Sequence, residues 1–205
     1  IKIKKVKNLM PELKNSDCSD IWLWGQGKKP TLPHFNSIHK INGSVISAVD
    51  LIKGIGKLCG LNVLNVEGAT GYLDTNYKGK VSAALESLKK DDFCMIHIEA
   101  PDETGHEGDY EKKIQAISDL DEKVVGPIIE GLKAGHDEYK ICIVSDHPTP
   151  VDIRTHSYEY VPYLIFDSRL NKNKHNQNTF SERSANESSL IHDDGHKLLA
   201  SFLKN

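Results

Sequence analysis

The chain has 205 residues, of which 38% are hydrophobic and 27% are charged, and its formal net charge is -3 at pH 7. This length suits one domain with a hydrophobic core, or part of a larger enzyme. The charge balance argues against nucleic acid or a membrane surface as partner. No apolar run approaches the roughly 20 residues of a membrane helix and no signal peptide opens the chain, so we predict a cytoplasmic protein.

The N-terminal part of the chain predicts a linker followed by a strand and a helix. Residues 1–20 are rich in lysine and asparagine, which indicates an edge strand or a linker, and residues 20–30 predict a buried strand that breaks into a glycine loop. From Ser44 onward, apolar residues recur at steps of three and four. This spacing predicts a helix over residues 44–60, with Gly60 in the C′ position after its end.

The rest of the chain alternates between the two kinds of pattern. The apolar patterns predict strands at residues 61–66, 92–100, 139–146 and 161–166, and helices at residues 78–90, 110–132 and 192–203. We expect a bend in the long helix at Gly126 and Pro127, because proline cannot donate a helical hydrogen bond. Alternating strands and helices predict an α/β fold with a largely parallel sheet and helices on both faces.

Metal-binding side chains follow two of the predicted strands. Asp102 and His106 come just after residues 92–100, and Asp146 and His147 end the strand at 139–146. His156 lies ten residues after Asp146 and precedes the next strand. Because ligands collect at the carboxyl ends of parallel strands, we expect these side chains to converge.

The chemistry of this set points to two metal ions. Imidazole nitrogen and carboxylate oxygen together suit divalent ions such as zinc or manganese. Five donors exceed what one tetrahedral ion takes from protein, whereas two ions about 3.5–4 Å apart would share them and clamp a phosphoryl group. The sequence therefore predicts a two-metal site.

Each member of the set also has an ordinary explanation. Asp102 could cap the helix that follows it, and His156 alone could be a surface histidine. Their common place at strand ends favours the metal interpretation. We interpret the remaining histidines as structural or solvated: His34, His39, His97, His136, His175, His192 and His196.

Five separate motifs carry a resemblance to a known family: "IWLWGQG", "GSVISAVDLIKGIGKLCGL", "GATGYLDTNYKGK", "EAPDETGHEGD" and "SDHPTPVDIRTHS". In this order they resemble the archaeal-type cofactor-independent phosphoglycerate mutases of the alkaline phosphatase superfamily. The resemblance implies an alkaline-phosphatase-like core and interconversion of 3-phosphoglycerate and 2-phosphoglycerate through a phosphoserine enzyme.

The resemblance also implies a ligand set and a metal. Asp102, His106 and His156 would hold one divalent ion, and Asp146 and His147 would hold the other. The metal would be manganese in most members and zinc, cobalt or magnesium in some. The phosphoglycerate would be the small-molecule partner, and the sequence leaves the oligomeric state open.

The chain departs from the family pattern at its front. Family members begin with a strand that carries a metal-binding aspartate, followed by the nucleophilic serine and an inserted domain, and none of these is visible here. We therefore expect residues 1–20 to be the tail of that inserted domain, or a linker, and residues 21–205 to be the C-terminal part of the metal-binding domain. Without the missing N-terminal half, this segment is expected to be inactive.

Two cations are candidates for contact with the substrate. Lys80 could stabilise the negative charge on the phosphoryl oxygens, or it could belong to a solvated turn. Arg154 lies between the ligands and could face either phosphate or solvent. Two alternatives stay open for the function: another two-metal phosphatase or phosphotransferase, such as the homoserine kinase relatives, and a catalytically silent fragment.

Overall fold

The computed structural model describes residues 25, 27–170 and 179–204. The chain divides into two units, Ile1–Leu32 and Pro33–Asn205, and the elements below all belong to the second. The tail predicted for residues 1–20 lies outside the described residues, as does most of the strand predicted at residues 20–30. Residues 27–30 form neither helix nor strand, which agrees with the predicted glycine loop.

A parallel three-stranded sheet forms the centre of this unit. Its middle strand is β1 (Gly43–Ile46), which pairs with β2 (Asn62–Leu64) on one side and with β3 (Phe93–Ile96) on the other. Val45 and Ile46 are almost completely buried, as expected for the middle strand of a covered parallel sheet. Both pairings are parallel, so each connection must cross over the sheet.

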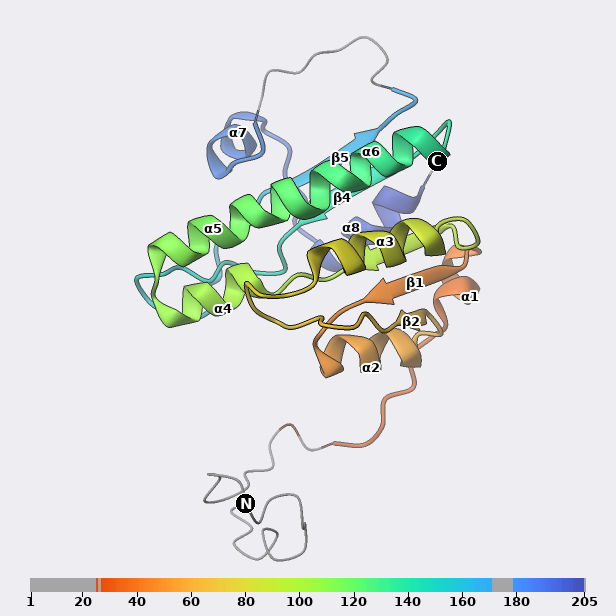
Figure 1. Ribbon diagram of the computed structural model, residues 1–205, viewed down its shortest axis with the longest axis horizontal. Coiled ribbons are helices and arrows are strands. Elements are labelled where there is room, and N and C mark those ends of the chain that lie inside the picture. Colours follow the sequence, from red (N-terminus) through yellow and green to blue (C-terminus); the bar gives the residue numbers. More distant parts are fainter. Residues whose placement is uncertain (1–24, 26, 171–178, 205) are drawn as a thin grey trace, which may run out of the picture. The chain divides into compact units, whose positions relative to one another are not determined.

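Two helices supply these crossovers. The connection from β1 to β2 contains α2 (Asp50–Leu58), and the connection from β2 to β3 contains α3 (Tyr77–Ser87). The two helices cover opposite faces of the sheet (Figure 1). The predicted α/β class, with helices on both faces, is confirmed.

The helix predicted over residues 44–60 is wrong at its start. Val45 and Ile46 belong to β1, and α2 begins only at Asp50. A strand buried on both faces is apolar at consecutive positions, so these two residues also fit the helical steps, and periodicity alone cannot separate the two structures. The predicted end is confirmed, because Gly60 follows the helix with a left-handed φ of 75°.

The last two strands form a separate antiparallel pair. β4 (Lys140–Val144) pairs with β5 (Tyr163–Asp167) in a register that places Cys142 opposite Ile165. The connection over residues 145–162 contains turns and no crossover helix, so β5 returns in the opposite direction. The described strands therefore form two sheets, a parallel one of β1 to β3 and an antiparallel one of β4 and β5, and the strand pattern alone did not predict the second.

The long helix predicted at residues 110–132 is present but interrupted. It consists of α5 (Tyr110–Leu120), a π-helical turn, η3 (Asp121–Val125), and α6 (Gly126–Gly135). The amide of Gly126 donates to the carbonyl of Asp121, five residues back, which is the π-helical pattern. Pro127 cannot donate a hydrogen bond, so the helix is irregular at the place where the sequence predicts a bend.

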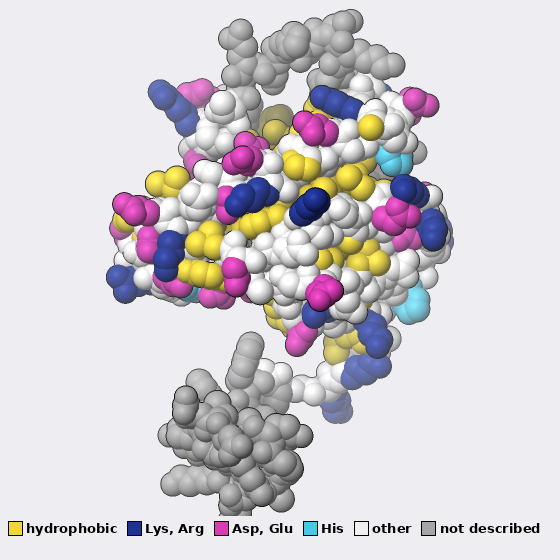
Figure 2. Space-filling model, viewed as in Figure 1, with side chains coloured by type: hydrophobic (Ala, Val, Ile, Leu, Met, Phe, Trp, Pro, Cys, Tyr) yellow, Lys and Arg dark blue, Asp and Glu magenta, His cyan; other side chains and the backbone are white. Residues whose placement is uncertain are grey.

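The main hydrophobic cluster lies between α3 and this interrupted helix. Tyr77, Val81 and Val124 are buried together, and Leu85 and Ile96 pack against them. The π-helical turn thus contributes a core residue to the surface that faces α3. Hydrophobic side chains on α5 stay exposed, and Figure 2 shows hydrophobic atoms over the region of α5 and α6.

Three more short helices lie outside these elements. The predicted closing helix is present as α8 (Gly195–Leu203), whereas α1 (Phe35–His39) and α7 (Glu182–Glu187) were not predicted. Across the residues described, none of the helices has the length and apolar character needed to cross a membrane. The cytoplasmic location stays a prediction.

Candidate metal centre

The first two predicted ligands lie on the helix that follows β3. This helix, α4 (Ala100–Glu107), has Pro101 in its first turn, where the missing amide hydrogen costs no hydrogen bond. Asp102 and His106 are four residues apart and so share one face. His106 Nε2 lies 3.4 Å from Asp102 Oδ2, which means that the helix backbone itself brings this pair together.

The other three ligands lie on the connection between β4 and β5. His147 Nε2 is 3.3 Å from Asp146 Oδ2, and the His147 ring stacks on the His156 ring with centroids 3.6 Å apart. His156 Nε2 lies 3.5 Å from Asp102 Oδ1 and 3.1 Å from His106 Nε2. The structure thus brings Asp102, His106, His147 and His156 into one cluster, and Asp146 adjoins it through its neighbour His147.

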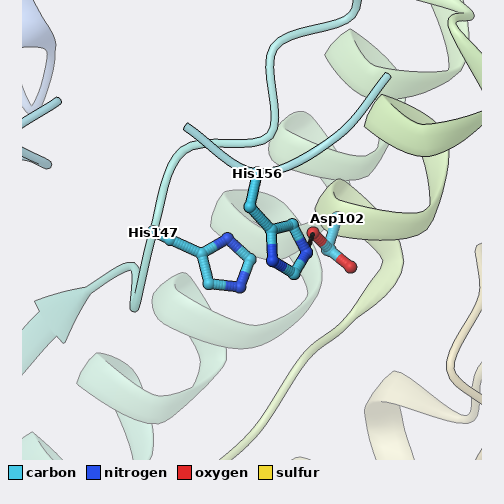
Figure 3. Close-up of side chains that lie close together, drawn as sticks. All are labelled: Asp102, His147 and His156. Carbon is cyan, nitrogen blue, oxygen red and sulfur yellow. Dashed lines mark ion pairs between the residues drawn. The ribbon is translucent and has the colours of Figure 1, made fainter. Parts of the chain in front are cut away.

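One group of close donor atoms combines residues that the resemblance assigned to different ions. Asp102, His147 and His156 offer donor atoms that all lie within 4.8 Å of one another (Figure 3). The resemblance placed His147 with Asp146 at the second ion instead, so the assignment of ligands to ions stays a prediction. A second acidic group, Glu99 with Asp102 and Glu103, adjoins it. Neither glutamate is among the predicted ligands, although both flank Asp102 in the motif.

The hydrogen bonds of two histidines fit metal binding. His106 Nδ1 lies 3.0 Å from the carbonyl oxygen of Arg154, and His147 Nδ1 lies 3.4 Å from that of Pro148. A carbonyl only accepts, so Nδ1 carries the proton in each neutral ring and Nε2 keeps its lone pair. Metal-binding histidines characteristically donate their second N–H in this way. The residues present therefore fit a divalent cation.

Lys80 is buried beside the cluster. It is only 1% exposed, and its Nζ lies 3.5 Å from the carbonyl oxygens of Thr70 and His97. Burial lowers the pKa of Lys80, and the carboxylate of Glu99 acts in the opposite direction. Asn76 fixes the start of α3 by accepting from the Gly79 amide. Lys80 is therefore a fixed internal cation and not part of a solvated turn.

Arg154 supports the cluster through its backbone. Its φ of 53° lies in the left-handed region, and its carbonyl oxygen is the partner of His106 described above. The guanidinium lies against Gly108, so close that a Cβ at that position would overlap it. The predicted contact between Arg154 and substrate is not tested by this arrangement and stays a prediction.

His97 lies closer to the cluster than the sequence suggested. It follows β3 directly, and its Nδ1 is 3.1 Å from Ser47 Oγ. Burial lowers the pKa of His97, with Asp146 raising it and Lys80 lowering it to a smaller extent. Its alternation within the predicted strand indicates a structural or solvated histidine. Its place at the carboxyl end of β3 was the signal that could have included it.

Comparisons with known proteins show the family to which the chain belongs. The family model of the Metalloenzyme superfamily matches residues 5–197. A 2,3-bisphosphoglycerate-independent phosphoglycerate mutase of Methanothrix thermoacetophila is 49% identical over 179 residues, which is 87% of this chain and 45% of that protein. The Methanosarcina barkeri protein of the same name is 46% identical over 173 residues, or 84% of this chain and 43% of that protein.

A solved structure is similar to this chain in its fold. The structure of a Pyrococcus horikoshii protein superposes with a TM-score of 0.75 at 30% identity, covering 83% of this chain and 50% of that chain. The chain spans about half the length of the curated relatives it matches. The predicted resemblance to the cofactor-independent phosphoglycerate mutases is confirmed by these relatives. With a family match over most of its length, the chain belongs to the Metalloenzyme superfamily.

Proposed function

We propose that this chain is the C-terminal part of the metal-binding domain of a cofactor-independent phosphoglycerate mutase, which interconverts 3-phosphoglycerate and 2-phosphoglycerate. The observation that carries the proposal is the convergence of Asp102, His106, Asp146, His147 and His156 at the ends of two strands. The names of relatives at 46% and 49% identity support it. Residues 1–20 would then be the end of an inserted domain, and residues 21–205 the metal-binding part.

The ligand set would hold two divalent ions, with manganese as the proposed metal and zinc, cobalt or magnesium as the alternatives. Mixed imidazole and carboxylate donors without thiolate suit manganese and zinc. When bound, the ions would polarise the phosphoryl oxygens and lower the pKa of a nucleophilic hydroxyl. The nucleophilic serine would come from the part of the longer protein that the resemblance places ahead of this segment.

Lys80 would bind the phosphoryl group. Its ammonium is held in place by burial, and both of its neighbouring carbonyl oxygens lie at 3.5 Å, the outer limit of a hydrogen bond. Such a cation keeps donor capacity for an incoming anion and needs little reorganisation when negative charge develops. The side chain of Arg154 would be the second cation to meet the substrate.

The test uses the full-length protein. Elemental analysis after purification in manganese should find two ions per chain, and His156→Ala should lose one of them, because His156 contacts both Asp102 and His106. His196→Ala, on the exposed surface of α8, is the matched control and should keep both ions. Phosphorus NMR should show the conversion of 3-phosphoglycerate by the wild type.

Two outcomes would overturn the proposal. A His156→Ala protein that keeps both ions would remove this residue from the centre. A metal-loaded protein that hydrolyses phosphate esters or phosphorylates an amino acid, yet leaves the phosphoglycerates unchanged, would assign it to another branch of the superfamily.

A further inference from the structure

Thr149 connects the two halves of the metal centre. It lies two residues after His147 on the connection between β4 and β5, and it is only 5% exposed. Its hydroxyl donates a hydrogen bond to the carboxylate of Asp102 on α4, and its oxygen lies 3.3 Å from Nδ1 of His147. One hydroxyl thus touches a ligand from the helix and a ligand from the loop.

The direction of these hydrogen bonds follows from chemistry. A carboxylate can only accept, so the single hydroxyl hydrogen of Thr149 goes to Asp102 Oδ1. The hydroxyl oxygen then accepts from His147, which requires the proton on Nδ1. The nearby carbonyl of Pro148 requires the same tautomer. The Nε2 atom of His147 then keeps its lone pair, on the side of the ring where Asp146 Oδ2 lies 3.3 Å away.

The backbone of Thr149 is fixed as firmly as its side chain. Its carbonyl oxygen accepts from Lys113 Nζ on α5 at 2.7 Å. The same oxygen presses against α4 at Gly105, where an added Cβ would overlap it. Thr149 is therefore held by a partly buried lysine on one side and by close helix packing on the other.

We propose that Thr149 is a positioning residue of the metal centre, which orients Asp102 and sets the tautomer of His147, and that Lys113 holds it in place. This inference rests on the proposed function in so far as the cluster binds divalent ions. Without the hydroxyl, Asp102 Oδ1 loses its donor and can rotate, and the His147 ring loses one of two partners that fix its proton. Partners of this kind contribute about 10–100-fold to metal affinity.

Thr149→Val and Thr149→Ser form the matched pair for the test. Valine keeps the branched shape and removes the hydroxyl, whereas serine keeps the hydroxyl and removes the methyl group. In the full-length protein stripped of metal, titration with manganese by calorimetry should give affinity about 10–100-fold weaker for Thr149→Val. The serine variant should stay within about 3-fold of the wild type, a difference of less than 1 kcal/mol. Lys113→Met should also weaken binding.

The outcomes separate this inference from the proposed function. A wild-type protein that binds no divalent ion would remove the proposed function. A wild type that binds, together with a Thr149→Val variant of equal affinity, would overturn only the role of Thr149. Equal losses in the valine and serine variants would assign the effect to packing. Metal-free thermal unfolding of all variants shows whether each one folds, and the serine variant still decides the question if the valine variant does not.

Discussion

The two sets of ligands are held in place by different means. Asp102 and His106 lie on α4, where the helical repeat itself places them on one face. Asp146, His147 and His156 lie on residues 145–157, which have no regular structure. Their positions depend on contacts with α4 and α5. The α4 ligands are therefore positioned by local helix geometry, whereas the three loop ligands are positioned only when residues 145–157 pack against α4 and α5.

The contacts that seat the loop come from several directions. Lys113 holds the carbonyl of Thr149, Tyr110 donates a hydrogen bond to the carboxylate of Asp152, and His106 donates to the carbonyl of Arg154. By contrast, α4 is stabilised by contacts within the helix. Thr104 donates a hydrogen bond to the Ala100 carbonyl, and the helix ends at Gly108, which has a left-handed backbone conformation. We expect changes at the contacts between residues 145–157 and α4 or α5 to affect metal binding more than changes elsewhere in the fold.

The largest effect is expected from Gly105→Ala. A Cβ there would overlap the backbone carbonyl of Thr149, and a backbone atom cannot turn aside as a side chain can. We expect unfolding free energy to fall by about 1–3 kcal/mol and metal affinity to fall with it, because the loop lifts from α4. Gly54→Ala is the control, since nothing lies within 4 Å of its Cβ position in α2.

The control should move in the other direction. An exposed helical glycine replaced by alanine should gain up to about 1 kcal/mol. Urea unfolding of both variants, with and without manganese, measures the two effects. If Gly105→Ala unfolds and binds metal like the wild type, the close seating of the loop on α4 is wrong.

Arg154 allows its backbone and its side chain to be tested separately. Both Arg154→Ala and Arg154→Gly remove the guanidinium, but only glycine adopts the left-handed φ of 53° without strain. We expect the glycine variant to be more stable than the alanine variant by about 1 kcal/mol in thermal or urea unfolding. Both should keep their metal, because the carbonyl that meets His106 remains.

Substrate kinetics of the same two variants give an independent result. If Arg154 binds phosphate, the KM for phosphoglycerate should rise equally in both. An unchanged KM would limit this residue to its backbone role.

The helical half of the centre was easier to predict than the loop half, for physical reasons. Asp102 and His106 follow from local spacing, and the strand ends suggested that the other ligands would join them. No local pattern reveals that Thr149 joins the two sets, because its contacts come from residues far away in sequence. Similarly, the burial of Lys80 depends on packing around α3, and the buried strand at Val45 fits a helical pattern equally well.

A smaller effect is expected from Tyr110→Phe. This change removes only the hydrogen bond to Asp152 at the exposed outer edge of the loop. We expect a loss of about 0.5–1 kcal/mol, the low end for a single hydrogen bond, and faster amide hydrogen exchange over residues 150–156. Tyr158→Phe, at a fully exposed tyrosine, is the control and should leave exchange unchanged. Equal exchange in all three proteins would show that this contact does not hold the loop.

The smallest effect on the centre is expected from Asp167→Asn, which lies in β5. Hydrogen bonds from Arg169 are the main cause that lowers the pKa of Asp167 from 3.8 to about 2. Since the folded pKa is below the unfolded one, this carboxylate stabilises the fold above about pH 4 and loses that contribution as pH falls toward 2. The variant should therefore be less stable at neutral pH. Its unfolding free energy, measured in urea, should fall less than that of the wild type as pH is lowered from about 4 to 2.

Metal affinity of Asp167→Asn at neutral pH should equal that of the wild type, because the contacts of Asp167 are to Arg169 and Lys140 and not to the ligand loop. The β4 and β5 pair can thus be distinguished from the ligand loop by measurement. A change that weakens the strand pair should lower stability and leave metal affinity unchanged, whereas Gly105→Ala should lower both. A parallel loss of metal affinity in Asp167→Asn would mean that the antiparallel strands, and not the helices alone, hold the loop in place.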